Sequence, residues 1–168
     1  MEENQYMQGK LRNMASVYLS HKDKMLLLYR RGSKVVNNVW IASAGGHFEE
    51  NELNDAQACV LRELQEELSV TVDMIENLRL RYVVLRYVKG EIRQNYYFFA
   101  ELKGDNEIEF CSNEGIAKWF PLTELNSLEM PFSAQFAIEH YLKEGRYTDV
   151  LYGGVADGEK VVFTEMRE

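Results

Sequence analysis

The chain has 168 residues and a formal net charge of −8, and 46% of its residues are hydrophobic. This length and composition predict a single globular domain over residues 1–168 and exclude a disordered chain. The excess of acidic residues argues against nucleic acid as a partner, because like charges repel the phosphate backbone. No apolar run reaches the ~20 residues that span a bilayer, so we expect no membrane partner. The polar start at residues 1–5 lacks the order of a signal peptide, and we therefore expect a cytoplasmic protein.

Apolar and β-branched runs in the first quarter of the chain predict strands. Residues 14–19 and 25–30 are two such runs, separated by a polar turn. A third strand, over residues 39–44, leads the chain to the paired glycines Gly45 and Gly46. Because glycine permits a close backbone approach, the carbonyl of Gly46 is a candidate metal ligand.

A helix is predicted to follow the glycine pair. Asn54 is its expected N-cap, since a side-chain oxygen can accept a free N–H of the first turn. Four apolar residues then recur at helical spacing: Val60, Leu61, Leu64 and Leu68. At about 100° per residue, three carboxylates share a different face of this helix: Glu63, Glu66 and Glu67.

This acidic face is electrostatically unfavourable. Each like-charged pair at i,i+3 or i,i+4 destabilises the helix by a few tenths of a kcal/mol. Glu66 and Glu67 also lie near the negative end of the helix dipole, and Arg62 can relieve only part of the charge. A divalent cation would account for the rest, because Mg²⁺ is bound by one or two carboxylates together with phosphate oxygens. A solvated acidic helix end is the alternative interpretation.

The second half of the chain continues with strands and one more helix. Strands are predicted over residues 78–88, 92–102 and 117–120, then a helix over residues 134–143 capped by Ser133. Residues 150–155 and 161–166 predict a C-terminal β-hairpin. The order of these elements predicts an α/β fold with a helix on each side of a mixed sheet.

The segment around the first helix resembles the Nudix box, whose pattern is G-x5-E-x7-R-E-U-x-E-E-x-G-U with U an aliphatic residue. Residues 62–70 match its second half, except that Ser69 stands where the family has glycine. Counting forward from Gly46 puts the isolated glutamate of the pattern at Glu52. Counting back from Arg62 puts Asn54 in that position, so the loop is two residues longer than the pattern.

The resemblance covers roughly residues 14–143 and implies an α-β-α sandwich with a mixed sheet between its helices. It further implies a hydrolase that cleaves a pyrophosphate bond in a nucleoside diphosphate linked to another group. Mg²⁺, or Mn²⁺, would be held by the box carboxylates, with Arg62 orienting them: Glu63, Glu66 and Glu67. Nudix enzymes often place an extra glutamate in a later loop, which makes Glu114 the candidate general base.

Several residues outside the box are candidates for substrate contacts. Arg30, at a strand end, could meet a phosphate, and Trp40 and Phe48 could stack on a base. A surface arginine and core aromatic residues are the alternatives. With Trp119, these aromatic residues favour a purine nucleoside triphosphate, such as an oxidised one, cleaved to monophosphate and pyrophosphate.

Other substrates and a second class of function stay open at this point. Sugar nucleotides, dinucleoside polyphosphates and non-nucleotide phosphates are substrates that the box does not discriminate. A homodimer is also left open. A non-catalytic domain that senses a nucleotide or an ADP-ribose derivative is the other class, but the three retained box carboxylates favour an enzyme.

Overall fold

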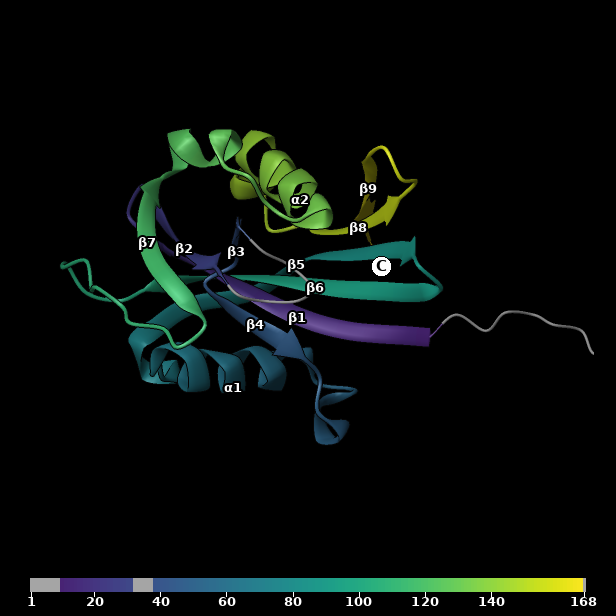
Figure 1. The fold of residues 1–168 in the computed structure, drawn as a ribbon. Coiled ribbons are helices and arrows are strands. Elements are labelled where there is room, and N and C mark those ends of the chain that lie inside the picture. The colour runs from purple at the N-terminus through teal and green to yellow at the C-terminus, as the bar shows by residue number, and fades with distance from the viewer. Residues whose placement is uncertain (1–9, 32–37, 168) are drawn as a thin grey trace, which may run out of the picture.

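The computed structural model describes residues 10–31 and 38–167, and in them two helices lie on opposite faces of one mixed sheet (Figure 1). The helices are α1 (Ala56–Leu68) and α2 (Phe132–Lys143). The strands are β1 (Lys10–His21), β2 (Lys24–Arg30), β3 (Val39–Ile41), β4 (Ala44–His47), β5 (Ile75–Val88), β6 (Glu91–Leu102), β7 (Gly115–Pro121), β8 (Leu151–Ala156) and β9 (Val161–Met166). This architecture confirms the predicted α-β-α sandwich and its C-terminal hairpin.

The long strand β1 organises the sheet. The strand order is β3-β2-β1-β6-β5-β8-β9, with β4 also paired to β1 and β7 also paired to β2. On one side β1 pairs in parallel with β6 along almost its whole length. On its other side, residues 14–17 pair with β4 and residues 19–21 pair with β2. Strands β2 and β4 therefore share one edge of β1, end to end.

Residues 39–44 do not form the single strand that the sequence predicts. The structure divides them, since β3 pairs with β2 whereas β4 pairs with β1. Between the two strands, the buried hydroxyl of Ser43 donates to the carbonyl of Leu26 at 2.6 Å and accepts from the N–H of Leu19 at 2.8 Å. Ser43 thus satisfies backbone groups of β1 and β2 at the point where the chain changes partner.

Two cores form because successive side chains of a strand point to opposite faces. Val17 and Leu19 of β1 pack on the α1 side with three apolar residues of that helix, Val60, Leu64 and Leu68. Tyr18 lies between them in sequence and packs on the α2 side, with Ala137 and Ile138. The stripe predicted for α1 is confirmed, and Leu61 also packs against the α1-side core.

Both predicted helix caps are wrong by one or two residues. Asp55, not Asn54, caps α1, and its carboxylate accepts the N–H of Ala58 at 3.0 Å. Ser133 is the second residue of α2 rather than its cap, because the helix begins at Phe132 directly after Pro131. Among residues 10–31 and 38–167, no side chain caps the N-terminus of α2.

The hairpins follow the sequence closely. Strands β5 and β6 meet around Lys89 and Gly90, both with positive φ. Strands β8 and β9 form the C-terminal hairpin, and β8 adds in parallel to β5, so the hairpin extends the main sheet (Figure 1). Within the part of the chain that the structure describes, no helix is long and apolar enough to cross a membrane.

Candidate active site

Arg62 of α1 connects the acidic helix to the loop before it. Its guanidinium donates to both carboxylate oxygens of Glu52, from Nε at 3.0 Å and from Nη2 at 2.9 Å. Its Nη1 donates to Glu63 at 2.9 Å and to Glu66 at 3.0 Å. The hydrogen bonds from Arg62 hold the pKa of Glu52 below its usual value. Of the two positions that the spacing allowed for the isolated glutamate, the structure selects Glu52, which is only 3% exposed.

The paired glycines press directly against the α1 carboxylates. A Cβ atom added to Gly46 would lie 2.3 Å from Oε1 of Glu63, so a larger residue there would displace that carboxylate. The carbonyl of Gly46 points toward α1, where it contacts Sγ of Cys59 at 3.8 Å. Gly46 therefore lets the backbone of β4 approach the buried carboxylate of Glu63.

Glu63 and Glu67 meet beside this glycine pair. Burial, the charges of Glu63 and Glu114, and a hydrogen bond with Glu63 raise the pKa of Glu67 to about 8, while hydrogen bonding from the Gly45 backbone opposes the shift. Two carboxylates that meet in a partly buried place cannot both ionise without a counter-charge. Glu63 already has the guanidinium of Arg62 as a partner, and a divalent cation can supply the counter-charge that Glu67 lacks.

The third box carboxylate, that of Glu66, shares the Nη1 group of Arg62 with Glu63. Glu66 is 57% exposed and its carboxylate is engaged by Arg62. Within residues 10–31 and 38–167, no three side chains of Asp, Glu, His or Cys are positioned to hold a metal ion together. The donor set nevertheless fits a hard cation, because Glu63, Glu67 and the glycine backbone offer only oxygen ligands, which Mg²⁺ and Mn²⁺ prefer.

The end of α1 has the backbone conformation that the family glycine would adopt. Ser69 has φ 55° and ψ 29°, which is the left-handed region. Its N–H donates to the carbonyl of Gln65 at 3.1 Å and closes the helix. The serine therefore preserves the turn after the carboxylates, at the steric penalty of a Cβ atom in this region.

Two of the predicted residues outside the box come together near the site. Arg30, at the end of β2, forms an ion pair with Glu114 at 3.5 Å. Glu114, just before β7, is close enough to Glu67 for its charge to raise the pKa of that residue. The ends of β2 and β7 therefore add one guanidinium and one carboxylate to the group of carboxylates on α1.

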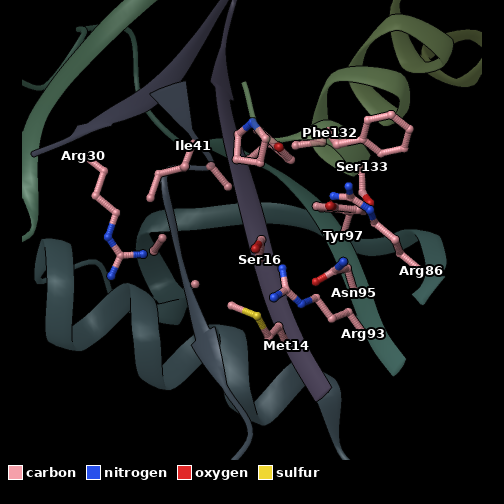
Figure 2. Close-up of a pocket in the computed structure, with 16 residues that line it drawn as sticks. Met14, Ser16, Arg30, Ile41, Arg86, Arg93, Asn95, Tyr97, Phe132 and Ser133 are labelled. Atoms are coloured by element: carbon pink, nitrogen blue, oxygen red, sulfur yellow. The ribbon is translucent and has the colours of Figure 1, made fainter. Parts of the chain in front are cut away.

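A cavity of about 160 Å³ adjoins this group on the α2 side of the sheet (Figure 2). Gly45 and Arg30 lie at its edge toward the carboxylates. Residues of three strands form its floor: Met14, Ser16, Tyr18, Arg86, Arg93, Asn95 and Tyr97. Pro131 and the first residues of α2 form its wall: Phe132, Ser133 and Ala134. The cavity is open to solvent at its mouth and suits a ligand that reaches from Gly45 across β1 and β6.

The predicted base-stacking residues do not line this cavity. Trp40 packs on Tyr29 and Phe120, with ring centroids 4.9 and 4.6 Å apart. Phe48 lies on the α1 side of the sheet against Tyr96. Both aromatic residues contribute to packing in this structure, as the core alternative expected.

Sequence reasoning missed the residues that line the far end of the cavity. Arg93, Asn95 and Tyr97 alternate along β6 on the face that elsewhere carries core side chains, such as Phe99. Polar residues at such inward positions are a sequence signal for a binding site. Their partner Arg86 carries no such signal, because only the strand register brings it opposite Arg93.

The fold and the site together define a class of protein. It is an α-β-α sandwich in which Arg62 joins the acidic helix α1 to Glu52, in the loop that follows the paired glycines. A family model described as the NUDIX domain matches residues 10–141. The chain belongs to the Nudix family, a family of catalytic pyrophosphohydrolases that typically use divalent metal ions and bind nucleotide substrates.

Solved structures with the same fold are distant in sequence. A MutT protein from Bacillus halodurans is 22% identical, with a TM-score of 0.64 over 94% of this chain and 99% of that chain. An Ap4A hydrolase from C. elegans is 17% identical, with a TM-score of 0.62 over 77% and 94% of the two chains. A NUDIX hydrolase from Nitrosomonas europaea is 17% identical, with a TM-score of 0.63 over 88% and 79%. A comparison with proteins of curated function found no match.

Proposed function

We propose that this chain hydrolyses a pyrophosphate bond in a nucleoside diphosphate linked to another group, with Mg²⁺ or Mn²⁺ as cofactor. The observation that carries the proposal is the meeting of Glu63 and Glu67 against the glycine backbone, at the edge of a cavity lined by arginines. Paired carboxylates beside Arg30 suit a substrate whose phosphates are bound by a cation on one side and by a guanidinium group on the other.

The cation would be held chiefly by Glu63 and Glu67, with the carbonyl of Gly46 as a further oxygen ligand. Glu66 can join them, because its exposed side chain is free to turn away from Arg62. When bound, a divalent cation neutralises phosphate oxygens and lowers the pKa of water. Arg62 contributes indirectly, since it fixes the loop at Glu52 and orients Glu63.

Glu114 is the proposed general base. In the substrate-free protein its carboxylate is paired with Arg30 at 3.5 Å, across a surface that is partly open to solvent. A substrate phosphate would compete for Arg30, because guanidinium binds phosphate with bidentate geometry. Glu114 would then be released to accept a proton from the attacking water.

Cleavage of a nucleoside triphosphate to monophosphate and pyrophosphate remains our proposed reaction. The reason for a purine preference is weaker, because the aromatic residues that suggested it belong to the two cores: Trp40, Phe48 and Trp119. Two structural neighbours carry the names MutT and Ap4A hydrolase, so both mononucleotides and dinucleoside polyphosphates belong in a test.

The decisive experiment is a panel of nucleoside triphosphates, oxidised purine nucleotides, nucleotide sugars and dinucleoside polyphosphates, assayed with Mg²⁺ and with EDTA. Chromatography of the products identifies the bond that is cleaved. We expect turnover that needs the cation and yields a nucleoside monophosphate. Turnover that persists in EDTA, or only of phosphates without a nucleoside, would refute the proposal.

A further inference from the structure

The cavity carries more positive charge than the described residues around it neutralise. Three arginines line it, Arg30, Arg86 and Arg93, and none of the described residues that line it is Asp or Glu, although the chain as a whole carries a net charge of −8. Arg30 is paired with Glu114 at the edge toward the α1 carboxylates. The unbalanced charge therefore lies at the other end.

Arg86 and Arg93 are direct cross-strand neighbours in the β5–β6 pair. Like charges in this position destabilise a sheet. Arg93 shares one carboxylate, that of Glu91, with Arg12, at 3.3 and 3.1 Å. Arg86 has no carboxylate partner among the described residues, and its guanidinium lies 4.3 Å from the ring centre of Phe132. An anion between the two strands would relieve this repulsion.

Helix α2 directs its N-terminus at the same place. Its first residues line the cavity, and no described side chain caps its free N–H groups, which carry the positive end of the helix dipole. Ser133, in the first turn, is 5% exposed, and its hydroxyl has no hydrogen-bond partner within the described ranges. Buried hydroxyl groups normally have partners, so an unsatisfied one at the wall of a cavity is available to a ligand or to a water molecule.

Figure 2 shows Ser133, Tyr97 and Arg86 together at the α2 wall, with Arg93 and Asn95 on the adjoining floor. We propose that this end of the cavity, here called the arginine site, binds a phosphoryl group. Its ligands are Arg86, Arg93, Ser133 and the first turn of α2. Two guanidinium groups and a helix N-terminus are the combination that recognises such an oxyanion.

The arginine site is separate from the place of the proposed reaction. Gly45 pairs with Ser16, and Ser16 pairs with Tyr97 on the next strand. Neighbouring strands lie about 4.8 Å apart and a strand rises about 3.3 Å per residue. Arg93 and Arg86 are four residues along β6 and β5 from the row of Gly45, so their backbones are about 16 and 20 Å from it. This span is too long for one diphosphate to contact both the α1 carboxylates and the arginine site.

The substrate class follows from this separation, and this step rests on the proposed function. The substrate is a diphosphate that carries a further phosphate on the group remote from the cleaved bond. Free inorganic phosphate would offer the same chemistry to the arginine site as a separate ligand. The two sources are distinguished by measuring binding and turnover independently.

Binding is tested without any metal or substrate, by thermal unfolding of the full chain in EDTA with increasing inorganic phosphate. Sodium chloride at matched ionic strength is the reference. We expect phosphate to raise the Tm, and Arg86→Gln to weaken the apparent affinity about tenfold, as the loss of a charge-assisted contact predicts. Arg86→Lys keeps the charge, and we expect it to show an intermediate loss of phosphate affinity. It replaces Arg86→Gln in the test if the glutamine variant does not fold.

Arg79→Gln is the matched control, because Arg79 lies on the same strand β5 but lines another basic pocket and pairs with Asp149. It should leave the phosphate response unchanged. The arginine site is wrong if chloride stabilises as well as phosphate does, if Arg86→Gln responds like the parent chain, or if Arg79→Gln alone loses the response.

The substrate class is tested with matched pairs that differ by one remote phosphate, namely NADP⁺ with NAD⁺ and coenzyme A with dephospho-coenzyme A. We expect the phosphorylated member to have a kcat/KM about tenfold higher, and Arg86→Gln to remove the difference. Equal or better turnover of the member without the phosphate overturns the substrate class. Failure of every pair, together with an intact phosphate response in the binding test, assigns the arginine site to free phosphate and overturns only the substrate step.

Discussion

Arg62 and Glu52 form a two-point contact, with Nε–Oε2 and Nη2–Oε1 distances of 3.0 and 2.9 Å, between helix α1 and the loop that precedes it. The two residues are ten apart in sequence, and the carboxylate is almost fully buried. The same guanidinium reaches Glu63. One ion pair therefore couples the shape of the loop to the orientation of a proposed metal ligand.

Glu52→Gln should lower both stability and activity. The variant removes the charge that pairs with Arg62, and a hydrogen bond to a charged group contributes about 1.5–3 kcal/mol. We expect the free energy of unfolding, from urea denaturation, to fall by about 2–3 kcal/mol. Glu49→Gln is the control, because Glu49 is 59% exposed and lies 3.7 Å from Arg62. Equal losses in both variants would contradict a special role for Glu52.

Glu67→Gln should abolish turnover while the fold survives. The substitution keeps side-chain size and helix propensity but deletes one of the two carboxylates that meet beside Gly45. We expect kcat to fall by several orders of magnitude and stabilisation by Mg²⁺ to disappear from thermal unfolding curves. Glu139→Gln, on α2, should change neither quantity. A fully active Glu67→Gln variant would reduce the acidic face to a solvated helix end.

Stability without metal should depend on pH through Glu67. Its pKa in the folded protein is about 8, against an ordinary value of 4.5, so the folded state retains a proton that the unfolded state has released. The free energy of unfolding therefore falls as pH rises between these two values. In EDTA, Tm should decrease from pH 5 to pH 9, and more steeply than in Glu67→Gln. Parallel curves for the two proteins would exclude Glu67 as the titrating group.

Ser69→Gly should stabilise the protein. Ser69 has a positive φ of 55°, where a Cβ atom costs about 1 kcal/mol and glycine has no such penalty. We expect urea denaturation to show a gain of about 0.5–1 kcal/mol with unchanged activity. Ser69→Ala keeps the Cβ atom and should give no gain, which separates backbone strain from loss of the hydroxyl.

Glu114→Gln tests the general base. If Glu114 accepts the proton of the attacking water, its amide replacement lowers kcat about 100-fold and removes the acidic limb of the pH–rate profile. Substrate KM should fall and not rise, because the phosphate no longer competes with the Glu114 carboxylate for Arg30. Glu107→Gln, in the same β6–β7 connection but paired with Lys24, is the control. An unchanged kcat across pH would leave Glu114 outside the mechanism.

The sequence by itself determined the features that depend on local spacing. Helical periodicity placed Val60, Leu64 and the three box carboxylates on their faces of α1, because each position is fixed by its neighbours in the helix. The family resemblance and the two hairpins were likewise evident, since they rest on short contiguous patterns. Cap positions were wrong by one or two residues, because Asn54 and Asp55 are equally good caps in isolation.

Only the tertiary structure decided which residues meet from distant segments. The spacing left Glu52 and Asn54 as alternatives for the isolated glutamate of the box pattern. The loop folds so that Glu52 contacts Arg62, which identifies Glu52 as that residue. Composition could not tell that Trp40 belongs to a core, because an aromatic side chain serves packing and stacking equally well. The arginine site depends on the register of β5 on β6 and on where α2 begins. Long-range pairing sets both, and no local pattern encodes it.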